Sequence, residues 1–266
     1  MDELTHVSSL DDDLERAQAL EVSELADAIQ SIGFECTRCG ACCTADRREG
    51  CGPPTGESAS PTGESDSPTG ESESPRSESE SPTADDIEPH TATVFPDEIR
   101  RLQEAADDAD WRDVARPMPF GLETDDTGRK TGETFEWALQ TDDCGDCAFY
   151  AESADGTGAC TVHADRPLIC RTYPFSVALA GTSQPLGEAV DEAGLVRAHE
   201  CDGLGRDITR EGARSLAREL RRRAIREIEE AIALTDRYEP VRSAESEVVV
   251  FDSEGPKRPD GSHLEE

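Results

Sequence analysis

The sequence predicts a small, irregular, cysteine-rich α+β fold with short strands, flanking N- and C-terminal helices and a disordered acidic insertion. Helical periodicity is concentrated near the two ends, in residues 10–31 and 210–236. The segment between them holds short runs of strand-type residues separated by Gly-rich turns, which is typical of small sheets. Ten of the 266 residues are cysteine, and their spacing is the most informative feature of the chain.

Both terminal helices are predicted from one apolar face. In residues 10–31 the apolar residues recur at roughly helical spacing, at Leu10, Leu14, Ala17, Leu20, Leu25 and Ala28. In residues 210–236 the apolar residues from Ala213 to Ala231 fall within about 120° of arc on a helical wheel. The arginines Arg221–Arg223 lie mostly outside that stripe. We expect them to be solvated or paired with acids of the same chain, with attraction of an acidic partner as the alternative.

The middle of the chain shows one further helix and several short strands. Residues 91–106 read as a short strand and then a helix opened by Pro96 and Asp97, since proline and acids favour a first helical turn. Residues 131–140 alternate through three apolar side chains and predict a strand. Short extended pieces are expected around residues 160–163 and 173–180.

An acidic repeat interrupts this pattern. From Pro54 the chain reads PTGESAS, PTGESDS, PTGESES, PRSESES and PTADD. The segment has almost no apolar side chains with which to offset the entropy of ordering it, so residues 52–89 are predicted to be disordered. Such an insertion costs little, because loop-closure entropy grows only logarithmically with length. The predicted organisation is an N-terminal segment (1–30), a cysteine domain (31–205) interrupted by residues 52–89, a C-terminal helix (206–240) and a flexible acidic tail (241–266).

The charge balance is extreme. Asp and Glu number 60 against 26 Lys and Arg, and the net charge is −34. Nearly all the positive charge is arginine, a composition that suits a salty, halophilic cytoplasm. A broad face that neutralises nucleic-acid phosphates is not expected on such a chain. We expect a monomer, and the sequence names no protein partner.

Neither a membrane span nor a secretory signal is expected. No stretch approaches the roughly 20 apolar residues of a transmembrane helix, and residues 1–13 lack the apolar region of a signal peptide. A cytoplasmic location follows, where thiols remain reduced. The cysteines therefore call for an explanation other than structural disulfides.

The first cysteine cluster has the spacing of a metal site. It reads Cys36-x2-Cys39-x2-Cys42-Cys43. The C-x2-C-x2-C part matches the first ligands of a bacterial-type ferredoxin, and C-x2-C is also half of many zinc sites. The adjacent pair Cys42 and Cys43 serves either two centres or one larger cluster.

A second group follows about a hundred residues later. It consists of Cys144 and Cys147, Cys160 and His163, Cys170, and Cys201. These positions can complete sites begun by the first cluster, so that metal binding contributes to folding. His163 is either a ligand or a structural histidine, and His199 is expected to be incidental.

The combined pattern resembles a known family. C-x2-C-G-x-C-C, a P-x-E-I-x-R-L helix from Pro96, C-x-F from Cys147, and C-x2-H-x2-R-P-x2-C-R-x-Y-P-F from Cys160 are similar to the YkgJ-like cysteine-cluster family of zinc- or iron-chelating proteins. The resemblance covers residues 36–205 apart from the insertion. It implies metal binding by Cys36, Cys39, Cys42, Cys43, Cys147, Cys160, Cys170 and Cys201. Cys51 and Cys144 depart from the family pattern and are not expected to be ligands.

Two arginines follow the same motif. Arg166 and Arg171 flank Cys170, and they either hydrogen-bond thiolates or an anionic cluster, and so tune the metal site, or pair with acids. Tyr173 and Phe175 are expected in the core.

Three function classes compete. The favoured one is a protein holding an Fe–S cluster or iron for electron transfer, sensing or metal handling. The alternative is a zinc-binding structural or interaction module, for which eight thiols suffice for two tetrahedral sites. An enzyme related to flagellin lysine N-methylases is a third class, although no glycine-rich loop following a clear strand is evident, so the sequence leaves catalysis open.

Overall fold

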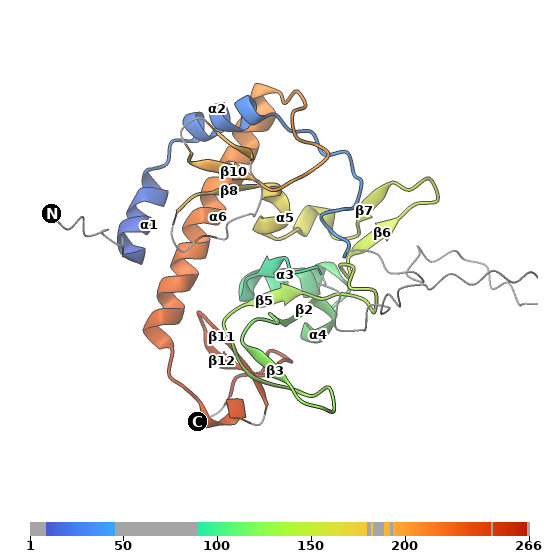
Figure 1. The fold of residues 1–266 in the computed structure, drawn as a ribbon, viewed down its shortest axis with the longest axis vertical. Helices are drawn as coiled ribbons and strands as arrows, with labels where there is room; N and C mark the ends of the chain where they lie inside the picture. The colour runs from blue at the N-terminus through green and yellow to red at the C-terminus, as the bar shows by residue number, and fades with distance from the viewer. Residues whose placement is uncertain are drawn as a thin grey trace, which may run out of the picture.

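One long helix organises the molecule. The computed structural model describes residues 9–45, 90–179, 182, 189–191, 194–245 and 247–264. Within them the chain has the predicted α+β class, with several small sheets packed with helices. Helix α6 (Arg210–Arg237) runs along most of the molecule in Figure 1. The elements that contact it include α1 (Leu10–Ala19), α2 (Val22–Ile32), α5 (Leu168–Thr172), β8 (Phe175–Val177) and β11 (Val248–Asp252). The Thr209 hydroxyl caps it by accepting a hydrogen bond from the Gly212 amide over 3.1 Å.

Two helices cover the first half of α6. They are α1 (Leu10–Ala19) and α2 (Val22–Ile32), where the sequence predicted one continuous helix. The chain turns at Leu20, whose ψ of 126° is extended rather than helical. Because neither Gly nor Pro marks this turn, periodicity could not find it. The break lets both Ala17 and Leu25 be completely buried in the core that α6 completes.

A three-stranded sheet lies over the same part of α6. The antiparallel strands β8 (Phe175–Val177), β10 (Val196–Ala198) and β9 (Ala189–Val190) are ordered β8-β10-β9. Phe175 is buried in the core with Leu220 of α6, which confirms the expectation that it is a core residue.

A second sheet and two helices lie along the other half of α6. Strand β1 (Thr93–Val94) leads into α3 (Pro96–Ala105), as the sequence predicted. Helix α4 (Trp111–Val114) is followed by β2 (Ala115–Pro117). Strand β5 (Trp137–Leu139) lies between β1 and β2 and pairs antiparallel with both. Trp137 is almost completely buried in this second core.

Residues 247–264 are part of this half, and for them the prediction of a flexible tail over 241–266 was wrong. The 3-10 helix η3 (Arg242–Glu245) is followed by β11 (Val248–Asp252) and β12 (Gly255–Lys257), which pair antiparallel with each other. Strand β11 also pairs parallel with β4 (Lys130–Thr134). Strand β3 (Leu122–Thr124) pairs antiparallel with the other side of β4 and forms the edge of this sheet. The run Val-Val-Val-Phe favours a strand, and Val249, Val250 and Phe251 are buried. The residues on either side of this run are acidic and turn-forming, and for that reason the whole segment was predicted to be a flexible tail.

The expected strand over 131–140 is divided in two. The chain leaves β4 after Thr134 and enters β5 at Trp137. Phe135 lies between them with 43% of its surface exposed. The apolar residues alternate without a break from β4 into β5, although the two strands belong to different sheets. The alternation alone therefore could not show where one strand ends and the next begins.

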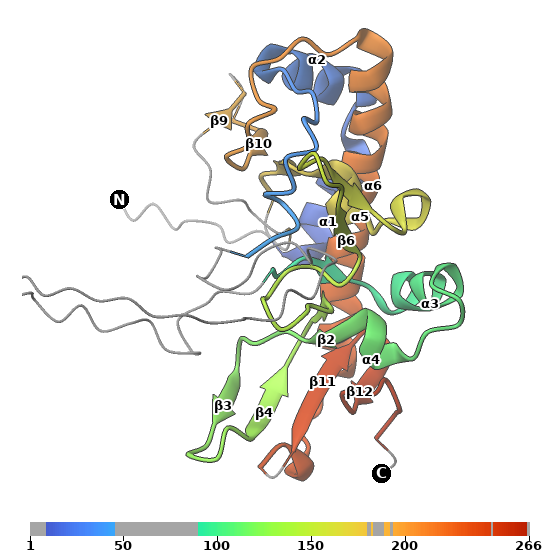
Figure 2. The ribbon, with the colours of Figure 1, turned by 90° about the vertical axis from the view of Figure 1, so that its right-hand side faces the viewer.

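The cysteine-bearing loops lie between the two halves, as Figures 1 and 2 show. They include the hairpin β6 (Tyr150–Glu152) and β7 (Gly158–Cys160), the 3-10 helix η2 (His163–Asp165) and the short helix α5 (Leu168–Thr172). The predicted extended pieces near residues 160–163 and 173–180 correspond to β7 and β8. Residues 52–89, predicted to be a disordered insertion, lie outside the described residues. No helix in the described part of the chain combines the length and the hydropathy needed to cross a bilayer.

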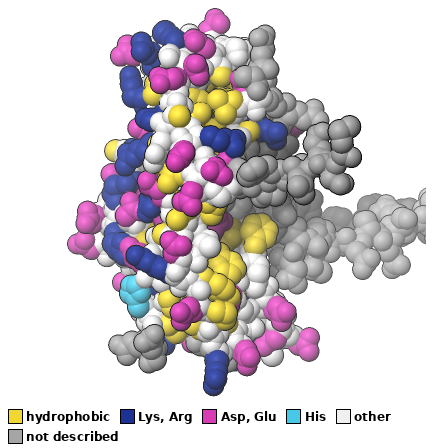
Figure 3. All heavy atoms as spheres, turned by 90° about the vertical axis from the view of Figure 1, so that its left-hand side faces the viewer, with side chains coloured by type: hydrophobic (Ala, Val, Ile, Leu, Met, Phe, Trp, Pro, Cys, Tyr) yellow, Lys and Arg dark blue, Asp and Glu magenta, His cyan; other side chains and the backbone are white. Residues whose placement is uncertain are grey.

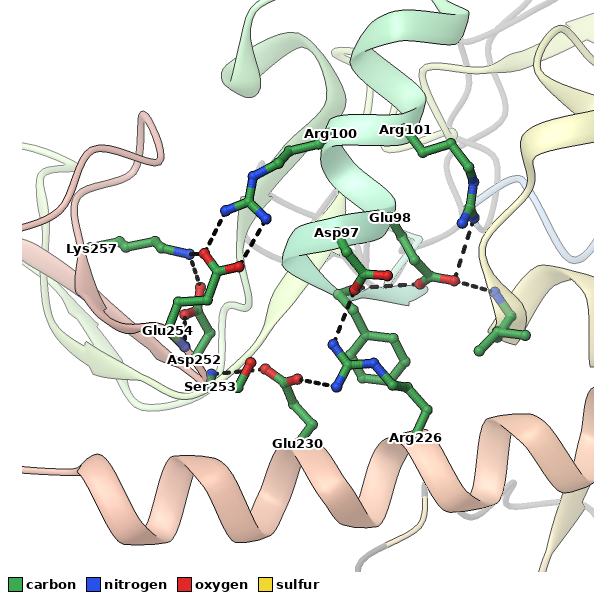
Figure 4. Close-up of polar contacts among 12 residues, drawn as sticks. Asp97, Glu98, Arg100, Arg101, Arg226, Glu230, Asp252, Ser253, Glu254 and Lys257 are labelled. Carbon is green, nitrogen blue, oxygen red and sulfur yellow. Dashed lines mark hydrogen bonds and ion pairs between the residues drawn. The ribbon is translucent and has the colours of Figure 1, made fainter.

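Charged side chains tie α3, α6 and the β11–β12 hairpin together (Figure 4). Arg100 donates to both carboxylate oxygens of Glu254, over 2.8 and 2.5 Å. Lys257 is buried and donates to Asp252 and Glu254, each over 2.7 Å. The Trp137 indole donates to the same Asp252 carboxylate over 2.8 Å. The hairpin is therefore fixed by hydrogen-bonded charges as well as by its strand pairing.

Candidate metal centre

The segment after α2 brings Cys36 to the chain that carries Cys201. Phe34 forms a β-bridge with Leu204, and the Glu35 amide donates to the Gly203 carbonyl over 2.9 Å. The Gly203 amide in turn donates to the Cys201 sulfur over 3.4 Å. Cys36 and Cys39 are exposed and Cys201 is half-buried. This group, Cys36, Cys39 and Cys201, is called the outer thiols.

A glycine turn separates Cys39 from the adjacent pair. Gly40 has φ +81°, and its carbonyl accepts from the Cys43 amide over 2.7 Å. A Cβ at Gly40 would lie 2.3 Å from the Tyr150 hydroxyl oxygen, so this position requires glycine on both conformational and steric grounds. The turn leaves the sulfurs of Cys42 and Cys43 3.7 Å apart.

Three cysteines of the second group gather beside Cys43. The buried Cys147 donates its amide proton to the Cys43 carbonyl over 2.8 Å. Cys160 on β7 lies opposite Tyr150 on β6, and Cys170 is on α5. Cys147 is buried in the second core, and Cys43, Cys160 and Cys170 pack against it. Cys147, Cys160 and Cys170 are called the inner thiols.

The thiols influence one another's ionisation. The pKa of Cys147 is raised to about 11, first by burial and then by the thiolates of Cys160 and Cys42, against amide hydrogen bonds that lower it. Burial also raises the pKa of Cys170, with added repulsion from Cys147, Cys160 and Cys42. Neutral thiols are thus favoured at pH 7, and a soft cation that replaces their protons would relieve this repulsion.

Cys42 is electrostatically coupled to both groups. The pKa of Cys201 is raised first by burial and then, against the Gly203 amide, by Cys39, Cys42 and Cys36. The pKa of Cys42 itself is raised above the ordinary thiol range, mainly by its hydrogen bond with Cys43 and by burial. Cys42 is therefore within electrostatic range of both the inner and the outer thiols.

The two candidate tuning arginines make different contacts. Arg166 donates from Nε to the His163 carbonyl over 3.1 Å, and its charge lowers the pKa of Cys42, Cys160 and Cys170. Arg171 donates to the carbonyls of Arg166 and Ala164 and lies 3.8 Å from Glu219. Arg166 thus acts electrostatically on the inner thiols, whereas Arg171 fastens the η2–α5 loop to α6.

Tyr150 and Tyr173 are site neighbours that the sequence did not single out as such. Tyr150 contacts the Gly40 turn. Tyr173 is half-buried and donates to the Glu200 carbonyl over 3.1 Å. Burial and the thiolates of Cys201, Cys42, Cys39 and Cys43 raise its pKa. A cavity of about 360 Å³ adjoins Cys42, Cys170, Tyr173 and His199. Tyr173 belongs to the Y-P-F part of the family motif, which is the sequence signal that could have identified it as a neighbour of the site. No motif includes Tyr150.

The remaining candidate residues lie apart from the thiols' hydrogen bonds. His163 is exposed on η2, and His199 stacks edge-on against Tyr173. Cys144 is disulfide-bonded, so the expectation of reduced thiols fails there, while the other eight described cysteines are free. Cys51 lies outside the described residues. Within the described ranges no three His, Cys, Asp or Glu side chains are already arranged to hold a metal ion.

Eight free cysteines, contributed by both halves of the chain, are a donor set that suits a soft metal, for which thiolate is the preferred ligand. A family model described as "CxxCxxCC: Putative zinc- or iron-chelating domain" matches residues 35–202, more than half of the chain. The chain belongs to this family. The family assignment supports chelation by the cysteine cluster and does not separate zinc from iron. No curated protein and no solved structure matches the chain.

Proposed function

We propose that this CxxCxxCC-family protein holds an iron–sulfur cluster or iron through Cys36, Cys39, Cys42, Cys43, Cys147, Cys160, Cys170 and Cys201. The observation that carries the proposal is the adjacent pair Cys42 and Cys43. The Cys43 carbonyl is hydrogen-bonded to Cys147, and Cys42 is coupled to both groups of free thiols. Iron is favoured because the thiols outnumber one tetrahedral site, and because C-x2-C-x2-C is ferredoxin-like spacing.

The proposed ligands divide into two sets. The Cys43 carbonyl is bonded to the Cys147 amide, which favours Cys43 with the inner thiols. Cys42 is coupled to both groups, and with Cys43 in the inner set it supplies the fourth thiolate of the outer set. Each set then has four thiolates, the number that one tetrahedral ion or one Fe–S cluster takes. Arg166 would offset the negative charge of the inner centre.

Zinc is the second candidate, and one distance favours it. Four sulfurs at about 2.3 Å from a tetrahedral zinc ion are about 3.8 Å apart. The sulfurs of Cys42 and Cys43 are 3.7 Å apart, so they could both bind one such ion. On this alternative the protein is a structural or partner-presenting module, and the adjacent pair belongs to a single centre.

Metal analysis of protein purified without oxygen tests the proposal. The protein is isolated in high salt, and one sample is used for elemental analysis, acid-labile sulfide and an absorption spectrum. Iron with matching sulfide and a broad visible band is the expected result. Zinc without visible absorption would replace iron by the second candidate. Neither metal in stoichiometric amount would overturn metal binding.

A further inference from the structure

An uninterrupted row of arginines runs along α6. It consists of Arg210, Arg214, Arg218, Arg222 and Arg226, which follow one another at every fourth position. Residues four apart lie on the same helix face, and like charges at this spacing destabilise a helix. In a chain with 60 acids and 26 basic residues, packing alone gives no reason to place five like charges in one row. This set is called the arginine row.

Only the ends of the row have acidic partners among the described residues. Arg210 pairs with Asp27 over 2.5 Å, and Arg226 pairs with Asp97 over 3.0 Å and with Glu230 over 3.1 Å. Arg214, Arg218 and Arg222 are exposed. In the described part of the chain, none of these three forms a hydrogen bond or an ion pair.

A pocket opens beside the row. It has a volume of about 340 Å³ and lies between α6, the start of α3 and the start of α5. The basic residues that line it are Arg101, Arg218, Arg221, Arg222 and Arg226. Of the acids around it, Asp97 is paired with Arg226, and Glu98 accepts the Leu168 amide. Glu229 is exposed. Many of the Lys and Arg side chains in Figure 3 lie along one edge of the molecule, interspersed with Asp and Glu, and this is the edge that α6 and α3 form in Figure 2.

We propose that the arginine row and this pocket bind an extended acidic segment of a partner protein. Successive arginines of the row are about 6 Å apart along the helix axis. Side chains on one face of an extended peptide are spaced by about 6.7 Å. Carboxylates at every second residue can therefore match the three central arginines of the row, Arg214, Arg218 and Arg222, which together turn by about 80° around the helix axis. Guanidinium groups bind carboxylates in a two-pronged geometry that suits such a contact.

The net charge of the whole chain does not prevent this contact. At an ionic strength of 0.15 M the repulsion is screened over about 8 Å, whereas a bound carboxylate lies at hydrogen-bond distance. The surface also adjoins the candidate metal centre. Leu168 lines the pocket, and Cys170 is on the same short helix α5. A partner bound here would contact the helix that carries one of the inner thiols.

Peptide binding tests the proposal. The probe is a fluorescein-labelled peptide of four Glu-Ser repeats, and the matched ligand control has Gln in place of Glu. Fluorescence anisotropy with the full chain should show binding of the acidic peptide and at least tenfold weaker binding of the neutral one. Arg218→Glu/Arg222→Glu should weaken acidic-peptide binding at least tenfold. Arg112→Glu/Arg197→Glu changes the net charge equally at exposed arginines elsewhere and should alter the affinity less than twofold.

The protein variants also separate binding from folding. Charge reversal turns the neighbours Arg214–Arg218 and Arg222–Arg226 into pairs of opposite charge, so the melting temperature should be unchanged or higher. Arg218→Gln/Arg222→Gln provides a second folded comparison. Equal binding of both peptides, or no binding of the acidic one, would overturn the proposal. An equal loss in the Arg112→Glu/Arg197→Glu control would also overturn it, since whole-molecule charge would then explain the effect.

Discussion

The Cys147 amide donates a hydrogen bond to the Cys43 carbonyl over 2.8 Å, and this bond joins the two halves of the cysteine set. Cys43 follows the Gly40 turn, while Cys147 follows the second sheet after β5. Metal binding at these positions would cross-link segments that are far apart in the sequence. Its binding free energy would then contribute to the stability of the whole domain.

The division into two centres predicts the metal content of cysteine variants. Cys147→Ser should remove only the inner centre and Cys201→Ser only the outer one, so each variant should keep about half of the metal, while the double variant loses it all. Cys144→Ser should keep its metal, because Cys144 is disulfide-bonded. Elemental analysis per protein measures this. Complete loss in either single variant would show one shared cluster instead.

The Gly40 turn predicts a steric effect that a matched glycine isolates. Gly40 and Gly128 both have φ +81°, but an added Cβ meets Tyr150 at Gly40 and nothing within 4 Å at Gly128. Gly128→Ala should cost about 1 kcal/mol from backbone strain alone. Gly40→Ala should cost about 2–4 kcal/mol, because the clash adds to the strain, and should also lower metal content. Urea unfolding of both variants, with metal analysis, tests the difference, and equal losses of stability would contradict it.

The parts that the sequence predicted correctly are those with local signals. Pro96 marked the start of α3, and the apolar stripe marked α6. The family resemblance, confirmed by the match over residues 35–202, located the cysteine cluster. These features depend on neighbouring residues or on a short motif, so they can be recognised without knowledge of the tertiary structure.

The parts that the sequence did not predict depend on distant contacts. The β11 strand is stable because it pairs with β4, which lies far from it in the chain. The turn at Leu20 lets α1 and α2 share one core with α6. The disulfide of Cys144 was unexpected because a reducing, cytoplasmic compartment had been inferred from the lack of an expected membrane span or signal peptide. The turn at Leu20 and the disulfide have no local sequence signature, and the apolar run of β11 is too short to identify a strand without its partner.

Glu98 on α3 accepts a hydrogen bond from the start of α5, so we predict that its substitution lowers the free energy of unfolding. Its buried carboxylate accepts the Leu168 amide over 2.9 Å and the Phe95 amide over 3.3 Å, and burial raises its pKa. Glu98→Ala leaves both amides without this acceptor and should cost about 2–3 kcal/mol. Glu98→Gln keeps an acceptor oxygen and should cost less. Chemical denaturation compares the two, and equal costs would argue against the hydrogen bonds as the cause.

Arg223 and Glu227 form a buried ion pair, and we predict that the two side chains are energetically coupled. The sequence suggested solvation or pairing for Arg221–Arg223. Arg223 is in fact buried and bonded to Glu227, to the Thr172 hydroxyl and to the Phe175 carbonyl over 2.8, 3.0 and 3.0 Å.

Removing one partner of this pair should be more harmful than removing both. Arg223→Met should cost about 3–5 kcal/mol, because Glu227 loses its cation. Arg223→Met/Glu227→Met should recover part of that loss, since no unpaired charge then remains. A double-mutant cycle by urea denaturation measures the coupling. A double variant as unstable as the sum of the two single variants would show that the pair is not coupled.

Glu254 predicts a specific acid dependence of stability. Its pKa is lowered from 4.5 to about 2, first by the hydrogen bond from Arg100 and also by Lys257. Because the folded pKa lies below the unfolded one, this contribution is present above pH 4.5 and is lost as the pH falls toward 2. It should amount to about 1 kcal/mol at neutral pH, since partly exposed pairs are screened by solvent. Glu254→Gln should therefore be less stable than the parent at pH 7, and the difference should shrink as the pH falls to 2. Exposed Glu104→Gln on the same α3 helix that carries Arg100 is the control and should show little difference at either pH, whereas a pH-independent loss in Glu254→Gln would assign the effect to packing rather than to charge.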